Sequence, residues 1–521
     1  MSDAHARWLA LAALAVAAGV RPPALKDAKA LLMALVGPVE ELGADSGLAD
    51  TGGADTGSDL GPEDTGGTDS GLGDTGGEAL SDCWELRPFI DLRMPLLAPP
   101  PNVLVVVLDD VGVDVLSLYG ASPAALTPRL DELGATGAVF DSAYASPVCS
   151  PTRAELMTGV AAPHHGVDGA LAWTEDHGLA CEHVTLPEAL REAGYTTAAF
   201  GKWHLDVVDE GGIEGARIHG FDRFAGTVGN LSMDFSLEGE PQGYLNWERI
   251  ENGSASWSST YATTKTIDDA ADWIADTSGP WFAYVALHAG HAPYHSPPEH
   301  LLSGGALPPA ADEVTQYLAM LEAADTEVGR LLDGLGSIPL ADTLVVVVGD
   351  NGSPDDVVGG YSKGTVFEAG VHVPMIFNGP GVTPGGRLSA LAQVADISAT
   401  VLASAYQPPL HATGQVWEGV SLSDVLFDAT LDGPRTHASN GVWHTNYLGE
   451  HHIEQSFVRE ARWKLIRRYA VDYDEDSWAL YDMDGDGEDI DLVLDGLDAE
   501  ERAAFNELVA IHDEIWPPVV P

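Results

Sequence analysis

From residue 102 onward, strand patterns alternate with helix patterns, and this alternation limits the possible folds more than any other feature. Val103–Leu108 and Thr343–Val348 are unbroken runs of aliphatic and β-branched residues, which is typical of strands buried on both faces. Thr185 and Glu188 have the spacing of a capping box, and apolar residues recur at helical spacing over 312–335. We therefore predict an α/β fold with a large, mainly parallel sheet sandwiched by helices.

The pattern changes after about residue 430. Three short strand-like pieces separated by polar turns follow: Phe457–Arg459, Trp463–Ile466 and Trp478–Tyr481. With a last helix expected at 498–515, they predict a small C-terminal antiparallel sheet plus helix. The expected domains are thus 98–430, which holds the large sheet, and a small α+β subdomain at 431–521.

The first hundred residues have a different composition. Arg7, the apolar run Trp8–Val20 and the small residues 15–17 are typical of a signal peptide, so we expect residues 1–20 to direct export to the periplasm, the cell surface or the medium. An apolar helix of an ordinary domain is the alternative. Residues 21–97 are predicted to be a largely disordered acidic linker rich in Asp-Thr-Gly, with weak calcium binding by its aspartates as a second hypothesis.

Charge and cysteine content exclude several classes of function. Acidic residues outnumber basic ones 80 to 24, for a formal charge of −56, which disfavours nucleic acid and anionic membranes as partners. The apolar run Trp8–Val20 has 13 residues, fewer than the roughly 20 that a membrane span needs. Three cysteines, Cys83, Cys149 and Cys181, are too few for a disulfide scaffold.

Both aliphatic strands end in acidic groups. Asp109 and Asp110 follow the first strand, and Asp350 and Asn351 follow the second after one glycine. Ligands of α/β sheets bind outside the carboxyl ends of strands, and a set of carboxylate and amide oxygens suits calcium or magnesium better than zinc. Each pair alone is also compatible with an ordinary loop or helix cap.

The string CSPTRAELMTG at 149–159 is the third notable element. Ser150 or Cys149 is expected to cap a helix that begins at Pro151, which would place the cysteine where backbone N–H groups favour an anion. Arg153 lies one turn further on and is expected to reach the same point.

At these residues the chain resembles the sulfatase family of the alkaline phosphatase superfamily. The string 149–159 matches the first family signature, and Gly194-Tyr195 followed by GKWHL at 201–205 matches the second. The resemblance continues in the same order through HAP at 291–293, DNG at 350–352 and KGT at 363–365, and covers about residues 100–490. His372 stands where the family often has arginine.

The resemblance implies a metal site and a modified nucleophile. Four side chains are expected to hold one calcium ion: Asp109, Asp110, Asp350 and Asn351. Cys149 is expected to be oxidised by a formylglycine-generating enzyme to formylglycine, whose hydrate supplies both a metal ligand and the nucleophile. If Cys149 is consumed in this way, Cys83 and Cys181 are the only possible disulfide pair in an exported chain, with two separate thiols as the alternative.

The remaining site residues are implied by the same resemblance. Arg153 is expected to hold the hydrate, and Lys202 and Lys363 to clamp the sulfate oxygens. His204 is expected to orient the hydrate and assist elimination, and His291 to act as acid near the leaving-group oxygen, with His288 as the structural alternative.

These roles imply an arylsulfatase-like sulfuric ester hydrolase that acts on a sulfated small molecule or glycan. Two other hypotheses stay open: a phosphonate or phosphate ester hydrolase of the same superfamily, and a non-catalytic surface protein.

Overall fold

The computed structural model describes residues 100–516, apart from 173–176, 208–210, 233–234, 238, 337–339, 406–416, 446–450, 470–476, 485–490 and 493. The predicted signal peptide, the predicted acidic linker and Cys83 lie outside the described residues. Cys149 is a free thiol, and Cys181 is disulfide-bonded. Among the described residues, no helix combines the length and the apolar character needed to cross a membrane.

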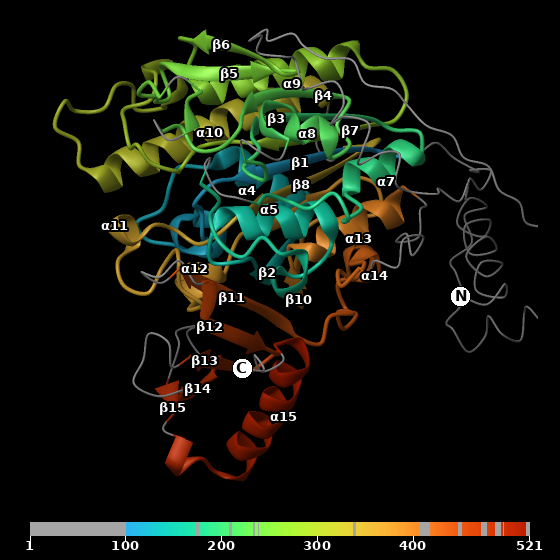
Figure 1. Ribbon diagram of the computed structural model, residues 1–521, viewed down its shortest axis with the longest axis vertical. Coiled ribbons are helices and arrows are strands. Elements are labelled where there is room, and N and C mark those ends of the chain that lie inside the picture. Colours follow the sequence, from blue (N-terminus) through green and yellow to red (C-terminus); the bar gives the residue numbers. More distant parts are fainter. Residues whose placement is uncertain are drawn as a thin grey trace, which may run out of the picture. The chain divides into compact units, whose positions relative to one another are not determined.

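A ten-stranded sheet is the main feature of the fold (Figure 1), in the order β10-β2-β9-β8-β1-β7-β3-β4-β5-β6. Its strands are β1 (Asn102–Leu108), β2 (Ala138–Tyr144), β3 (Thr196–Lys202), β4 (Arg223–Thr227), β5 (Trp247–Glu251), β6 (Ser254–Ser258), β7 (Trp281–Ala286), β8 (Thr343–Gly349), β9 (Met375–Asn378) and β10 (Gly386–Gln393). Pairings among β8, β1, β7, β3 and β4 are parallel, as is β10 with β2. β9 is antiparallel to both its neighbours, and β5 to β4 and β6. The prediction of a mainly parallel sheet is confirmed.

Helices cover both faces of this sheet (Figure 1). Those of the described residues in this part of the chain are α4 (Pro128–Thr136), α5 (Cys149–Thr158), α6 (Ala162–His165), α7 (Leu186–Glu192), α8 (Gly215–Ile218), α9 (Ala262–Asp276), α10 (Glu313–Leu335), α11 (Asp355–Val358), α12 (Glu368–Val371), α13 (Ala395–Ser404) and α14 (Ser423–Phe427). Val103 and Val105 of β1 belong to the core that includes α5, α7 and α13. Leu104 and Val106 belong to the core that includes α4, α9 and α10. Burial on both faces explains why β1 has no polar alternation.

Two helix starts follow the sequence signals. Thr185 accepts a hydrogen bond from the backbone of Glu188, whose carboxylate accepts one from the backbone of Thr185, so the predicted capping box is present. α10 begins after Asp312, whose side chain accepts from the backbone N–H of Thr315.

The C-terminal part forms a five-stranded antiparallel sheet, as predicted. Its strands are β11 (Ala438–Thr445), β12 (His451–Arg459), β13 (Trp463–Arg468), β14 (Ser477–Asp482) and β15 (Asp491–Leu492), in that order. Helix α15 (Ala499–Ile515) packs on one face through Leu508. The other face packs Phe457 and Tyr481 against Tyr144 of the large sheet. The domain limits 98–430 and 431–521 stay a prediction.

Candidate active site

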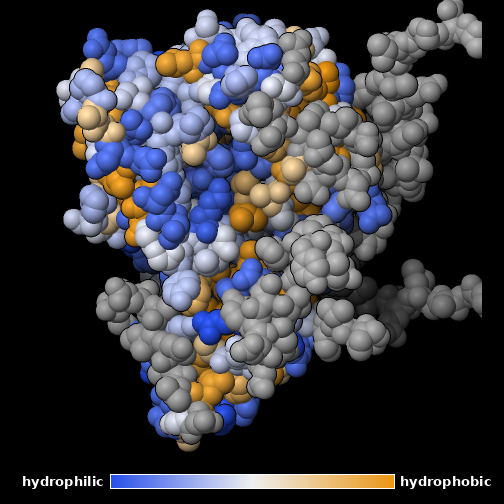
Figure 2. All heavy atoms as spheres, turned by 60° about the vertical axis from the view of Figure 1, so that its left-hand side comes forward, coloured by the Kyte–Doolittle hydropathy of each residue, from blue (hydrophilic) through white to orange (hydrophobic). Residues whose placement is uncertain are grey.

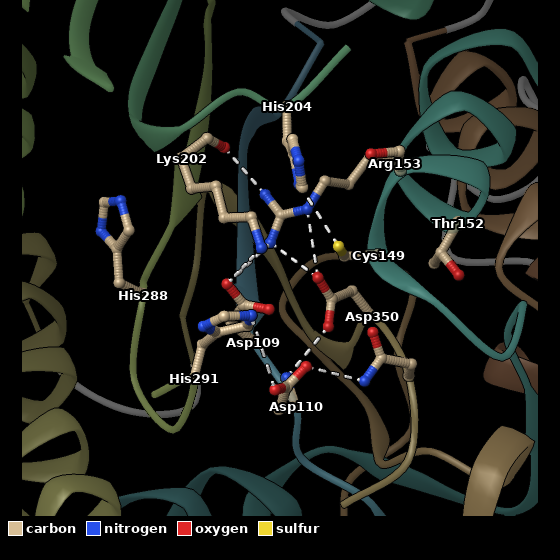
Figure 3. Close-up of polar contacts among 12 residues, drawn as sticks. Asp109, Asp110, Cys149, Thr152, Arg153, Lys202, His204, His288, His291 and Asp350 are labelled. Carbon is tan, nitrogen blue, oxygen red and sulfur yellow. Dashed lines mark hydrogen bonds and ion pairs between the residues drawn. The ribbon is translucent and has the colours of Figure 1, made fainter. Parts of the chain in front are cut away.

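The acidic residues of the two strand ends lie together (Figure 3). β1 and β8 are parallel neighbours with Leu108 opposite Gly349, so the two strands end at the same level of the sheet. The next carboxylates, Asp109, Asp110 and Asp350, are buried, and one oxygen of each lies within 4.8 Å of the others. The pairing register therefore assembles a cluster from residues 240 positions apart.

Hydrogen bonds hold this cluster in place. Asp110 has a φ of 60°, a left-handed backbone that is uncommon outside glycine and concentrates at functional sites. Its N–H donates to Asp350 Oδ1 over 3.1 Å, and its Oδ1 accepts from Asn351 Nδ2 over 2.9 Å. The hydroxyl of Tyr317 donates to the Asp110 carbonyl over 2.7 Å. Asn351 is thus fixed beside the three carboxylates.

Two oxygens of the cluster lack a partner. Asp109 Oδ1 and Asn351 Oδ1 are buried and form no hydrogen bond within the described part of the chain. Buried polar atoms without partners are costly and rare. A hard cation bound by carboxylate and amide oxygens would give both atoms a partner. The residues present therefore fit a calcium or magnesium ion.

Three basic side chains surround the carboxylates. Lys202 Nζ donates to Asp109 Oδ2 over 2.6 Å, and Lys363 Nζ to Asp110 Oδ1 over 2.5 Å. Arg153 Nη2 donates to Asp350 Oδ2 over 2.7 Å. Lys202 and Arg153 are fully buried, whereas the Lys363 side chain retains 21% of its exposure. Lys363 therefore lies nearest to solvent among the three.

Burial and charge act in opposite directions on the two central carboxyls. Burial raises the pKa of Asp350 to about 6, with a further rise from Asp109 and an opposing effect from Arg153. Burial also opposes ionisation of Asp109, but Lys202, His291 and Arg153 together hold its pKa well below the usual range. Asp109 is thus the more firmly anionic of the two.

Cys149 is the first residue of α5, not a residue before it. The helix begins at Cys149 and not at Pro151, and its N-cap, Val148, makes no side-chain hydrogen bond. The predicted cap is wrong because the Ser150 hydroxyl instead accepts from the backbone N–H of Leu171, over 3.1 Å. The thiol is still in the first turn, where backbone N–H groups are free. Burial raises its pKa, although Lys202 and Lys363 oppose the rise.

His204 presents a defined nitrogen to Cys149. Its Nε2 lies 2.8 Å from the Leu171 carbonyl, and its Nδ1 lies 3.3 Å from Cys149 Sγ. Because a carbonyl only accepts, Nε2 carries the hydrogen and the Nδ1 of the neutral ring has a lone pair facing Cys149. Burial, with Lys202 and Arg153, holds the pKa of His204 well below its usual value. The ring is therefore neutral at pH 7 and oriented as a base.

Of the two candidate histidines of the next segment, His291 faces the cluster. Its Nδ1 lies 2.8 Å from the Ala292 carbonyl, and its Nε2 lies 3.9 Å from Asp110 Oδ2. His288 lies apart from the cluster (Figure 3), with its Nε2 2.8 Å from the Thr227 hydroxyl. Burial lowers the pKa of both rings, that of His288 to about 3.

Arg153 contacts groups that its sequence position did not suggest. Its guanidinium binds Asp350, the Lys202 carbonyl over 2.8 Å and the Tyr284 hydroxyl over 3.4 Å, and Cys149 is among its electrostatic partners. Tyr284 could not be predicted as a site residue, because an aromatic residue within a buried strand has the pattern of a core residue. Tyr317 on α10 could not be predicted either, because it has the pattern of a core residue of a helix.

His372, the departure from the family pattern, lies outside this cluster. It stacks on Tyr144 with ring centroids 5.4 Å apart, and its Nδ1 lies 3.5 Å from Glu368. Its Nε2 lies 2.9 Å from the Asp141 carbonyl. His372 therefore packs between β2 and α12.

Comparison with known proteins agrees with this geometry. The model of the sulfatase family matches residues 101–406, more than half of the chain, and a model described as N-sulphoglucosamine sulphohydrolase, C-terminal, matches residues 358–509. The chain belongs to the sulfatase family, and thus to the sulfuric ester hydrolases.

Individual relatives support the assignment. Arylsulfatase A of Bos taurus is 32% identical over 379 residues, which are 65% of this chain and 70% of that protein. Arylsulfatase J of Mus musculus is 26% identical over 395 residues, which are 70% of this chain and 64% of that protein. The solved structure of Ps i-CgsB in complex with k-i-k-neocarrahexaose has a TM-score of 0.66 at 23% identity, covers 80% of this chain and 93% of its own, and shares the fold.

Proposed function

We propose that this protein hydrolyses sulfate monoesters at a calcium site, with the nucleophile at position 149 in the form of formylglycine. The observation that carries the proposal is the 3.3 Å contact between Cys149 Sγ and the Nδ1 of His204, beside the buried carboxylates and three cations. The proposal extends family membership to a substrate class and a mechanism for this chain.

Four residues would hold the calcium ion: Asp109, Asp110, Asp350 and Asn351. The partnerless oxygens of Asp109 and Asn351 support this ligand set. Without a metal, the negative charges of the three carboxylates equal the positive charges of the three basic side chains. A bound divalent cation, which supplies positive charge for the sulfuryl oxygens, leaves the site with a positive excess, and such a site favours an anionic substrate.

The group at position 149 is the proposed nucleophile. A formylglycine there supplies a hydrated aldehyde whose two hydroxyls can serve attack and later elimination. His204 Nδ1 is placed to accept a proton from this position, because the Leu171 carbonyl holds the ring in the required tautomer. Neutral His204 is therefore the proposed base.

The basic side chains would bind the sulfuryl group. Lys202 and Lys363 carry flexible ammonium groups that can donate to its oxygens as well as to Asp109 and Asp110. Arg153 is not assigned a direct contact with the sulfuryl group, because its guanidinium already donates hydrogen bonds to Asp350 and Tyr284. We assign to it the orientation of the metal ligand and a share of the positive potential.

His291 is the proposed acid for the leaving group. Its Nδ1 lies against the Ala292 carbonyl and its Nε2 faces Asp110, whose charge opposes the lowering of the His291 pKa by burial. His288 hydrogen-bonds Thr227 away from the cluster and is assigned a structural role.

The substrate is proposed to be a sulfated phenol or sugar. The names of the relatives, arylsulfatases A and J and an N-acetylgalactosamine-6-sulfatase of Canis lupus familiaris at 29% identity, are consistent with either. Maturation would require a formylglycine-generating enzyme, and the predicted signal peptide would place the enzyme outside the cytoplasm.

The direct test compares sulfate release with phosphonate cleavage. Protein coexpressed with a formylglycine-generating enzyme is expected to release sulfate from 4-nitrophenyl sulfate and from sulfated hexoses faster than it cleaves an aryl phosphonate monoester. The Cys149→Ala variant is the control and should be inactive on all of them. Faster phosphonate cleavage would favour the phosphonate hydrolase, and no turnover of any ester would favour a non-catalytic protein.

A further inference from the structure

An exposed aromatic residue lies next to the proposed sulfate site. Tyr361 is the most exposed of the large hydrophobic residues in the described part of the chain, at 70%. It is two residues before Lys363, whose Nζ contacts Asp110. Two residues span at most about 7 Å of chain. The backbone of Tyr361 is therefore close to that of Lys363, whose side chain extends to Asp110 in the proposed sulfate site.

The ring of Tyr361 is held in place, not free in solvent. It stacks on Phe367 with ring centroids 4.4 Å apart and an interplanar angle of 31°. Phe367 is only 8% exposed and meets Tyr481 of the small sheet edge-on, with centroids 6.1 Å apart. One side of the Tyr361 ring is thus fixed by packing, while most of the residue stays exposed.

Arg468 of the small sheet lies next to Phe367 and Tyr481. The guanidinium carbon of Arg468 lies 5.8 Å from the centroid of Phe367, and its Nη2 lies 3.5 Å from the Tyr481 hydroxyl. Arg468 forms no ion pair with any residue that the structure describes, although the chain has 80 acidic residues and 24 basic ones. A half-buried arginine without an ion pair among the described residues suits an anionic ligand.

The molecule as a whole is acidic, and one of its faces is shown in Figure 2. Figure 2 brings forward the side of the molecule that carries α11, and its described upper part is mainly hydrophilic with small separate hydrophobic groups. The net charge of −56 makes the average surface repel anions. In a chain of this net charge, an exposed aromatic ring and an arginine without an ion pair among the described residues both contact Phe367.

We propose that Tyr361 and Arg468 form a leaving-group subsite that selects sulfate esters of a sugar ring bearing a second anionic group. Tyr361 stacks on the apolar face of the ring, and Arg468 binds the second sulfate or a carboxylate. The small sheet thus contributes directly to specificity. The inference rests on the proposed function, because it takes Lys363 as the edge of the sulfate site.

Direct binding separates this inference from the hydrolytic mechanism. We would measure the Kd of a monosulfated and a disulfated hexose by calorimetry in a Cys149→Ser background, with calcium present. Tyr361→Ala is expected to raise the Kd of both sugars about tenfold, whereas Tyr361→Phe keeps the ring and stays within about twofold. Arg468→Ala is expected to raise the Kd of the disulfated sugar alone about tenfold.

Two matched variants serve as controls. Trp257→Ala removes another exposed aromatic residue, from the outermost strand β6. Arg502→Ala removes another arginine that packs on a phenylalanine, with its guanidinium 5.8 Å from Phe505 on α15. Both controls should leave each Kd within twofold, as should the affinity of every variant for inorganic sulfate.

Each outcome is decisive. Unchanged Kd values for both sugars in Tyr361→Ala and Arg468→Ala would overturn the subsite, whether or not the enzyme hydrolyses sulfates. Weakened binding in these variants, with no hydrolysis by the mature protein, would support the subsite and overturn the proposed function.

Discussion

At the residue scale, the atoms without partners say most about the site. Asp109 Oδ1 and Asn351 Oδ1 are buried and unbonded among the described residues, while the other Asp109 oxygen binds Lys202. An apoprotein with these two atoms unsatisfied bears an energetic cost of ~1–3 kcal/mol for each. A cation that binds both removes this cost, so metal binding and stability should be linked.

Replacing Asp350 with Asn should largely abolish the stabilisation of the protein by calcium. The substitution keeps the shape of the side chain but removes one anionic ligand and the negative charge that pairs with Arg153. Saturating calcium is expected to stabilise the wild-type protein by about 2.7 kcal/mol at one hundred times its Kd, and the variant far less. Thermal unfolding with and without calcium measures this. Asp342→Asn, an exposed site just before the same strand, should respond as wild type. An equal calcium response in Asp350→Asn would contradict the assignment.

Conversion of Cys149 is the second expectation at this scale. Peptide mass spectrometry of active protein should detect an aldehyde or its hydrate at position 149, in place of the thiol. Protein made without a formylglycine-generating enzyme is the comparison, and it should carry the thiol and release no sulfate. Full activity with an intact thiol would refute the modification, because a buried thiol with a raised pKa is a poor nucleophile.

At the element scale, α5 is held by hydrogen bonds at Glu155 as well as by the contacts of Cys149 and Arg153. Glu155 is fully buried, and its Oε1 accepts from Asn440 Nδ2 on β11 over 2.7 Å and from the Ser146 hydroxyl over 3.0 Å. The helix that carries Cys149 and Arg153 is therefore tied to the small sheet. Burial raises the pKa of Glu155 to about 7, against the opposing effect of Asn440.

This anchor should make stability depend on pH. The folded protein holds the Glu155 proton up to about pH 7, whereas the unfolded chain loses it near 4.5. The folded state thus binds more protons between these values, so the contribution is present below about pH 4.5 and is lost as pH rises through about 7. The loss amounts to about 3 kcal/mol.

Glu155→Gln removes the titration while keeping the shape. Relative to wild type, the variant should gain free energy of unfolding as pH rises from 5 to 8, measured by urea denaturation with calcium present. The exposed Glu313→Gln change on α10 is the control. If the difference between Glu155→Gln and wild type is the same at both pH values, Glu155 does not titrate as described.

At the scale of the whole molecule, charge is distributed unevenly. The chain has 24 basic residues against 80 acidic ones, yet Arg153, Lys202 and Lys363 converge on one cluster. Another buried ion pair joins α12 to the small sheet, where Lys464 Nζ contacts Glu368 Oε1 over 2.8 Å. Burial opposes ionisation of Glu368, but Lys464, His372 and Arg459 hold its pKa at about 2. Scarce basic residues are thus used where function and assembly need them.

The Cys83–Cys181 bridge is the prediction that concerns the whole chain. Cys181 is disulfide-bonded and Cys149 is free, while Cys83 lies outside the described residues. Peptide mapping without reduction is expected to recover the two peptides as one linked species, and the peptide containing residue 149 as a linear one. On the chain-entropy account, a bridge closing so long a loop stabilises by about 4–5 kcal/mol. Recovery of Cys83 as a free, alkylated thiol would rule the bridge out.

The sequence by itself determined the strands, several helix starts and the identity of the acidic pairs, because these follow from local patterns of burial and capping. The runs at Val103–Leu108 and Thr343–Val348 are strands, and the capping box at Thr185 is present. The small antiparallel sheet also followed from short strands between polar turns. In each case the deciding interactions span only a few residues.

The tertiary structure alone decided the strand order, the insertion of antiparallel β9 beside β8, and the partners of Arg153. It also decided that α5 begins at Cys149, because the hydroxyl of Ser150 is taken by Leu171. These features depend on contacts between residues far apart in the chain, whose energies no local pattern encodes. The site exists because the β1–β8 register places two distant strand ends side by side.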